Sequence, residues 1–136
     1  MCTVSSGAVY TEWGRYGTCT GDSTEMLYKG VVLADWHWHR RSEFICVDEE
    51  RATHAGNHGG DQNGALLYST EMEGGSSHEG WYPHDYEVGC SVCASGAPVY
   101  VRWGHRACPD DSTRLYEGLI CGEYHGHWGG GANYLC

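Results

Sequence analysis

Two short runs of acidic and amide side chains have the residue types that could hold a cation. Asp48-Glu49-Glu50 follows Cys46 directly, and Asp61-Gln62-Asn63 lies in a glycine-rich stretch. Calcium in proteins takes about six to eight oxygen ligands from carboxylates, amide carbonyls, backbone carbonyls and water. A polar surface turn is the alternative interpretation of the same residues. We expect calcium as a cofactor, with four candidate metal ligands: Asp48, Glu49, Asp61 and Asn63.

The same loop could also bind a sugar. Adjacent hydroxyls of galactose can be held by a carboxylate, an amide and a bound calcium, while an aromatic ring covers the apolar face of the sugar. Trp81 and Tyr82 are the candidate aromatic residues outside the repeated parts of the chain. The expected sugar-binding residues are Asp61, Gln62, Asn63, Trp81, Tyr82 and His39.

Two His-x-His pairs, His37-x-His39 and His125-x-His127, invite a metal interpretation because alternate residues of a strand face the same way. They occupy equivalent places in two similar units and are surrounded by Trp and Tyr. Histidines packed on aromatic rings and bonded to backbone carbonyls are the favoured interpretation. No nucleophile elbow, HExxH motif or phosphate-binding loop occurs, so we do not expect an enzyme.

The elements that must position these residues come from an internal repeat. We expect a single domain, 1–136, with repeat one at about 2–48, an asymmetric insertion at about 49–86 and repeat two at about 90–136. Because the insertion has no second copy, a single functional site is expected there. The matched positions are Val9, Tyr10, Trp13, Gly14, Cys19, Asp22, Ser23, Thr24, Leu27, Tyr28, Gly30, His37, His39 and Cys46, which correspond to Val99, Tyr100, Trp103, Gly104, Cys108, Asp111, Ser112, Thr113, Leu115, Tyr116, Gly118, His125, His127 and Cys136.

Eight cysteines in 136 residues indicate a disulfide framework made in an oxidising compartment, and hence a secreted protein. The symmetric pairing is Cys19–Cys46 and Cys108–Cys136, one closure for each repeat. A bridge between Cys90 and Cys93 is not expected if they lie on a strand. The order of the remaining cysteines, Cys2, Cys90, Cys93 and Cys121, stays open. A reduced zinc protein is the alternative, but no second Cys-x-x-Cys stands at zinc-ribbon spacing.

The fold class follows from short segments rich in Val, Tyr and Ile between Gly, Asp, Ser and Asn residues. Twenty-one glycines disfavour long helices, so we expect a mainly β domain, or β-rich α+β at most, with a helical turn or two around Ser23–Leu27. The expected strands are GAVYTEW, EMLYKGVVL, EFICV, ALLYST, YEVGCSV, PVYVRW, RLYEGLI and NYLC.

The formal net charge of −10, with only eight Lys and Arg, argues against a nucleic-acid partner and suits a divalent cation. No apolar run reaches membrane length, so membrane insertion is not expected. Ten Tyr and six Trp against one Phe favour surfaces where a ring packs on one side and meets a polar ligand on the other. A small domain that fills its core with these rings is the equal alternative.

Long motifs resemble the non-collagenous module of short-chain, spongin-type collagens of sponges, cnidarians and other marine invertebrates. Residues 98–136, which end in GGGANYLC, resemble the first half of that module, and residues 19–93 resemble the second through EFICVD, QNGALLY and CSVC. The order of the halves is reversed, as a circular permutation would produce. No Gly-X-Y tract is present, which places a collagen role in doubt.

Relatives of this module include calcium-dependent galactose-binding lectins, so the resemblance implies a secreted lectin whose partners are glycans with terminal galactose. It favours Asp48, Asp61, Gln62 and Asn63 as the site. With one insertion per chain, crosslinking would require a homodimer or a higher homo-oligomer. The alternative is an extracellular-matrix structural or interaction module without a small-molecule ligand.

Overall fold

The structure is a computed structural model, and it describes residues 2–3, 7–39, 43–52, 66–73, 83–124, 126 and 133–136. These residues form β-strands and no helix, so the expectation of a mainly β domain is confirmed. The predicted helical turn around residues 23–27 is wrong, because β2 begins at Thr24 and only a tight turn precedes it. The strands are β1 (Ala8–Trp13), β2 (Thr24–Ala34), β3 (Ile45–Asp48), β4 (Tyr68–Ser69), β5 (Glu71–Met72), β6 (Tyr86–Glu87) and β7 (Gly89–Ser95).

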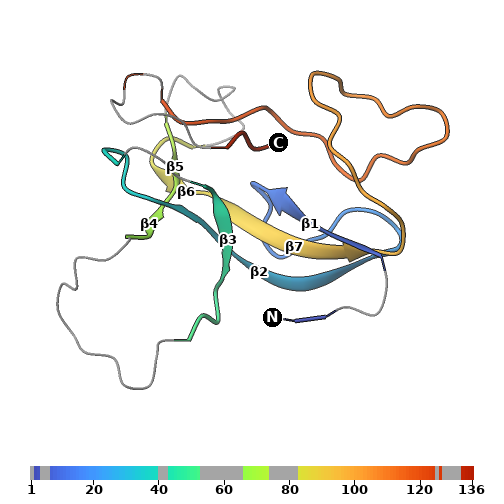
Figure 1. The fold of residues 1–136 in the computed structure, drawn as a ribbon, viewed down its shortest axis with the longest axis horizontal. Coiled ribbons are helices and arrows are strands. Elements are labelled where there is room, and N and C mark those ends of the chain that lie inside the picture. Colours follow the sequence, from blue (N-terminus) through green and yellow to red (C-terminus); the bar gives the residue numbers. More distant parts are fainter. Residues whose placement is uncertain are drawn as a thin grey trace.

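The main sheet is antiparallel, with the order β1-β7-β2-β3, and β4 pairs with the end of β2 (Figure 1). The last of the described strands, β7, therefore lies at the centre of the sheet. β7 pairs with β1 from Ala8↔Ser95 to Trp13↔Cys90 and with β2 along its other edge. A short second ladder joins β5 to β6 and forms a separate hairpin.

The core lies around the central strand. Six of the seven residues of β7 are buried, because the strand has a neighbour on each edge. Val32, Val88 and Cys90 form the buried cluster, and Trp13 and Phe44 are among the residues packed against it. A core this small leaves a large share of the stability to covalent links.

Two disulfides join the flanking segments to β7: Cys19–Cys93 and Cys46–Cys90. The expected pairing of Cys19 with Cys46 is therefore wrong. Residues three apart on a strand point to opposite faces, so Cys90 and Cys93 reach different partners and, as expected, do not bond each other. The prediction from the repeat assumed that both cysteines of a disulfide lie in the same repeat. In the structure, Cys19 and Cys46 each bond a cysteine of β7, which follows the insertion.

The chain after β7 runs on the β1 side of the sheet (Figure 1). The segments PVYVRW and RLYEGLI are not strands, and NYLC contributes only an isolated bridge between Cys121 and Leu135. Their periodicity is that of strands, but a strand needs a neighbour to hydrogen-bond with. Cys108 and Cys136 have free thiols, so the expected bond between them is not formed either. Among the described residues, no helix could span a membrane.

Candidate sugar and metal site

The sequence-predicted site residues fall into two groups. Asp61, Gln62, Asn63, Trp81 and Tyr82 lie outside the described residues. His39, Asp48 and Glu49 are described, and each has well-defined partners.

Glu49 is held by an aromatic residue and a lysine on the neighbouring part of the sheet. The Tyr16 hydroxyl donates a hydrogen bond to its Oε2, and Lys29 Nζ lies 3.0 Å from its Oε1. Lys29 Nζ also lies 4.7 Å from the centre of the Tyr16 ring. The hydrogen bonds from Tyr16 and then Lys29 hold the pKa of the Glu49 carboxyl below its ordinary value. Glu49 thus serves as a cross-strand ion-pair partner, and a metal ion would have to compete with Lys29 for it.

Asp48 ends β3 and shapes the turn that follows. Its Oδ1 accepts the backbone N–H of Glu50 at 2.9 Å, and its carbonyl accepts that of Arg51 at 3.2 Å. This is the side-chain-to-backbone pattern of Asx turns, in which a carboxylate replaces a backbone acceptor. Asp48 therefore has the role that the polar-turn interpretation gave it, and the structure shows no metal-ligand cluster at Asp48 or Glu49 among the described residues.

His39 lies in the short loop after β2, next to two exposed tryptophans. Its Nδ1 is 2.9 Å from Asp35 Oδ1, and its ring meets that of Trp36 edge-on at 5.3 Å. The hydrogen bond with His39, and then that from the Trp36 N–H, lowers the pKa of the Asp35 carboxyl. The expected packing on an aromatic ring is present, but the bonding partner is a carboxylate, not a backbone carbonyl. Trp36 and Trp38, 39% and 53% exposed, leave ring surface open beside it.

Sequence reasoning missed a cluster at the β5–β6 hairpin. His84 Nδ1 lies 3.6 Å from Glu73 Oε2 and 3.3 Å from Asp85 Oδ1, and the three side chains are exposed. One potential ligand atom from each lies within 4.8 Å of the others. Asp85 has a φ of 60°, a left-handed conformation that Asp tolerates better than most residues.

The hairpin brings these three side chains together from the two ends of one loop. Asp85 N–H donates to the Met72 carbonyl at 3.0 Å, which fixes the register of Glu73 against His84 and Asp85. The only sequence signal was His84-Asp85 within GWYPHDY, inside the insertion expected to carry the site. A hollow of about 140 Å³ lies next to it and is lined by residues that include Met72, Pro83 and Tyr86.

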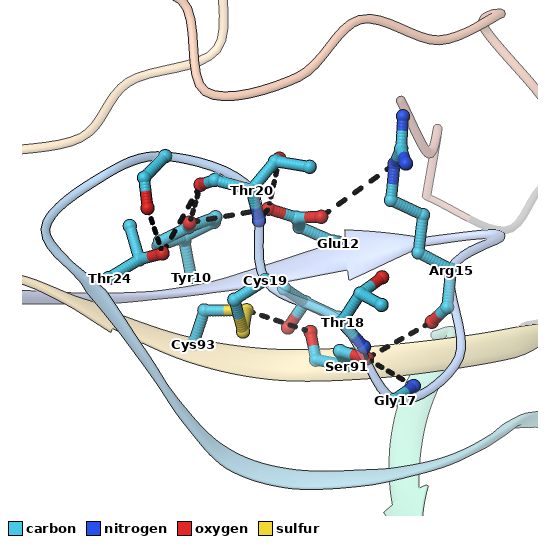
Figure 2. The surroundings of a disulfide bond; sticks show 12 residues. Tyr10, Glu12, Arg15, Gly17, Thr18, Cys19, Thr20, Thr24, Ser91 and Cys93 are labelled. Atoms are coloured by element: carbon cyan, nitrogen blue, oxygen red, sulfur yellow. Dashed lines mark hydrogen bonds and ion pairs between the residues drawn. A yellow bond between two sulfur atoms is a disulfide. The ribbon is translucent and has the colours of Figure 1, made fainter.

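A buried carboxylate shapes the loop that carries Cys19 (Figure 2). Glu12 has no exposed surface, and its Oε1 accepts hydrogen bonds from the Thr20 backbone N–H at 2.8 Å and hydroxyl at 2.7 Å. Arg15 Nε lies 3.7 Å from Oε2. Ser91 Oγ accepts the Gly17 N–H at 3.0 Å on the other side of the loop. These bonds hold residues 14–20 in the shape that brings Cys19 to Cys93, so Glu12 has a structural role.

The fold and these clusters define a small, mainly β domain stapled by two disulfides, with an exposed acid–imidazole cluster at one hairpin. Comparison with protein-family models, with curated proteins and with solved structures finds no match for the chain.

Proposed function

We propose that this protein is a secreted lectin that binds glycans with terminal galactose and depends on calcium. The observation that carries the proposal is the cluster of Glu73, His84 and Asp85. Two disulfides within the domain fit an extracellular protein. The cluster supplies carboxylates for a cation, and the two candidate aromatic residues for a sugar ring lie between Glu73 and His84 in the sequence.

The donor set fits calcium in part. Glu73 and Asp85 supply carboxylate oxygens, which calcium prefers, whereas the imidazole of His84 suits zinc and other transition metals. The remaining oxygens would come from the insertion, from water and from the sugar hydroxyls. Because both carboxylates are about two-thirds exposed, at 68% and 67%, we expect weak binding, with a Kd on the order of 10⁻⁴–10⁻³ M, as in extracellular modules.

The loop after β2 supplies a second aromatic surface at the same end of the sheet. The end of β2 pairs with β4, and β4 leads directly into β5, so the residues around His39 and the hairpin share one end of the molecule (Figure 1). Trp36 offers a ring face that could cover the apolar side of galactose, with His39 held beside it by Asp35. This shared position supports keeping His39 among the sugar-binding residues.

The test is a galactose-affinity and calorimetry experiment on the full chain. The double variant Glu73→Gln, Asp85→Asn should lose both calcium binding and retention on immobilised galactose. Glu117→Gln is the matched control, because this exposed carboxylate also has a cationic partner, Arg114, at 2.8 Å. Unchanged calcium-dependent retention in the double variant would place the site elsewhere. Binding of zinc but not calcium would reassign the cluster to a transition metal.

An extracellular-matrix or interaction module without a small-molecule ligand is the second candidate. The observation that favours it is the exposed apolar surface after β7, which includes Tyr100, Trp103 and Ile120 at 61%, 51% and 55% exposure. Exposed apolar patches commonly mark protein–protein contacts. A glycan array with calcium and then with chelator separates the two, because silence across all glycans favours the interaction module.

The lectin proposal also includes valency. One insertion per chain gives one main sugar site, so a lectin that crosslinks cells would be a homodimer or a larger homo-oligomer. Sedimentation analysis gives the assembly state, and calorimetry gives the number of sugars bound per chain. Two equivalent sugars per chain would instead indicate that both repeats bind.

A further inference from the structure

One glycine bend occurs in both halves of the chain. The aligned Trp-Gly pairs carry it, and the glycine has a positive φ in each half, 73° at Gly14 and 78° at Gly104. Glycine adopts this left-handed conformation without steric cost, so the aligned sequence bends the backbone twice in the same way. The side chains around the bend differ between the halves, and a function that exists in one copy is expected where two repeats differ.

In the first half, the residues before the glycine belong to the interior of the domain. Glu12 has no exposed surface, and Arg15 Nε lies 3.7 Å from its Oε2. The Tyr10 hydroxyl donates a hydrogen bond to Glu12 Oε1 (Figure 2), and Trp13 packs against the buried cluster. The positive charge of Arg15 is therefore neutralised by a buried carboxylate of the same bend.

In the second half, the counterparts of these residues are exposed, and a guanidinium replaces the carboxylate. Arg102 stands at the position of Glu12 and is exposed. Tyr100 and Trp103 stand at the positions of the two packed rings, and each is more than half exposed. The same bend thus presents two aromatic rings and a cation on the surface, where the first half has them in contact with its interior.

Hydrogen bonds inside residues 102–107, the arginine turn, fix its cationic side chains. Arg102 Nη1 donates to the carbonyl of Ala107 at 2.6 Å, and the Ala107 N–H donates to His105 Nδ1 at 2.9 Å. A guanidinium has five N–H donors, so Arg102 keeps donors for an outside partner. The side chain of Arg106 is exposed and forms neither a hydrogen bond nor an ion pair with the described part of the chain.

A third arginine joins the arginine turn to the next segment and is itself neutralised. Arg114 Nη1 lies 3.3 Å from the carbonyl oxygen of Arg106 and 2.8 Å from Glu117 Oε2. Arg114 therefore positions the turn and contributes little free charge. Arg102 and Arg106 remain as guanidinium groups that have no carboxylate partner among the described residues.

The arginine turn lies in a stretch of the chain without acidic side chains. Residues 88–109 include Arg102, His105 and Arg106 but no Asp or Glu, although the whole chain has a formal net charge of −10. The Debye length at physiological ionic strength is about 8 Å, so acidic groups farther away than this repel an anion at the turn only weakly. A local cationic site can therefore bind an anion on a protein that is acidic overall.

A groove of about 910 Å³ runs between β1 and the segments that follow β7. The two exposed rings and both unpaired arginines line it, together with three acidic residues, Asp22, Asp111 and Glu117. Because of these acidic residues, the anionic groups of a ligand are expected at the arginine turn and its uncharged parts along the rest of the groove. A ligand that suits this surface has spaced anions on a less polar framework.

We propose that the arginine turn binds the sulfate groups of a sulfated polysaccharide, with Tyr100 and Trp103 packed on its sugar rings. A guanidinium donates two parallel N–H bonds to two oxygens of a tetrahedral oxyanion such as phosphate, and sulfate has the same shape. Rings with a polar tip suit surfaces where one side is apolar and the other is wet, as on a sugar. A chain with repeated sulfates reaches Arg102 and Arg106 together, and the first contact raises the local concentration of the second sulfate.

Two observations favour a polysaccharide over other polyanions. The two disulfides fit an extracellular protein, where nucleic acid is not the usual polyanion. The exposed rings of Tyr100 and Trp103 match the flat apolar faces of sugars, whereas an acidic peptide supplies carboxylates without such faces.

This site is separate from the cluster at Glu73 on which the lectin proposal rests. The segment after β7 loops out on the right of Figure 1, whereas β5 and β6 lie on the left. No calcium takes part at the arginine turn, so binding of a sulfated polysaccharide should persist in chelator. Either proposal can therefore fail while the other holds.

The test measures binding of the full chain to dextran sulfate by surface plasmon resonance, with chelator present. Arg106→Gln should weaken binding about fivefold, because it removes one exposed charge contact and no hydrogen bond of the turn. The double variant Arg102→Gln, Arg106→Gln should weaken it about 20-fold. Arg51→Gln makes the same change of charge at an exposed residue after β3, so it is the matched control and should leave the affinity unchanged.

Salt and competing polymers complete the test. Counterion release at two arginines should lower the affinity about tenfold between about 50 and 200 mM salt. Equal binding of the double variant and the parent protein, or equal binding of dextran sulfate and uncharged dextran, would overturn the proposal. Tighter binding of polyglutamate or polyuridylic acid than of dextran sulfate would also overturn it and would assign the turn to an acidic protein or a nucleic acid. Because Arg106 has no partner within the turn, Arg106→Gln stays informative if Arg102→Gln disturbs the fold.

Discussion

Removing the disulfides one at a time should show how much of the stability of the domain depends on β7. The Cys19–Cys93 bond closes a separation of 74 residues and Cys46–Cys90 one of 44. Loop-closure entropy then gives about 4 kcal/mol of stabilisation for each bond, with the longer loop ahead by about 0.5 kcal/mol. We therefore expect the double variants Cys19→Ala, Cys93→Ala and Cys46→Ala, Cys90→Ala to lose similar amounts of unfolding free energy.

Urea denaturation followed by tryptophan fluorescence measures these losses. Both variants should lose somewhat more than the loop term alone, because Cys90 and Cys93 are fully buried, and Cys90 in addition packs in the cluster with Val32 and Val88. The free energy of unfolding is compared with that of Cys108→Ser, which removes a thiol that is not bonded in the structure.

Single substitutions test the pairing itself. Cys19→Ala should free the thiol of Cys93 and leave Cys46 protected from alkylation, because Cys46 is bonded to Cys90. If Cys46 were alkylated in that variant, Cys46 would be the partner of Cys19 in the parent protein. That result would contradict the two disulfides that join residues 19 and 46 to β7. A loss below about 1 kcal/mol in either double variant would contradict the entropic argument.

Two further results follow from single residues. Gly30→Ala would place a Cβ 1.8 Å from the Val47 carbonyl oxygen and should cost about 3 kcal/mol of unfolding free energy. Gly96→Ala is the control, because its Cβ would meet no atom within 4 Å. Equal urea midpoints for the two variants would contradict this packing. His39→Ala should raise the pKa of Asp35, which hydrogen bonding to His39 holds below its ordinary value. A depressed carboxyl pKa stabilises the folded state above the unfolded pKa and loses that effect as the pH falls through the folded pKa. The variant should therefore be less stable than the parent protein above about pH 4, and the difference should shrink as the pH falls through the folded pKa of Asp35. An NMR titration that leaves the pKa of Asp35 unchanged in His39→Ala would refute the pairing.

The strands of the main sheet were predictable because their signals are local. Val, Tyr and Ile runs bounded by Gly and Asp locate β1, β2, β3 and β7 in the sequence. Their order in the sheet was not predictable, because β7 is far in sequence from β1 and nothing in a run of side chains states which strand lies at the centre. The disulfide prediction failed at the same step, since Cys19 and Cys46 were matched to each other and not to β7.

In the candidate site too, contacts between residues close in sequence were predictable, and contacts made by strand pairing were not. Asp48 has the turn role that its neighbours in sequence indicated, with its carboxylate bonded to Glu50. Glu49 is engaged by Lys29, a contact made by the pairing of β2 with β3 and not visible in the run of acidic residues. Glu73 meets His84 and Asp85 only because β5 and β6 pair, so the cluster could not be found without the hairpin.

The position of β7 also explains how an irregular insertion can be held on a small core. The chain leaves the main sheet after Asp48, pairs with β2 again at β4 and returns at Gly89, and the Cys46–Cys90 disulfide joins the two ends of this segment. The ends are thus fixed by a covalent bond and by the buried cluster of Val32, Val88 and Cys90. The length of this segment can vary at little cost in free energy, because loop-closure entropy grows slowly with loop length.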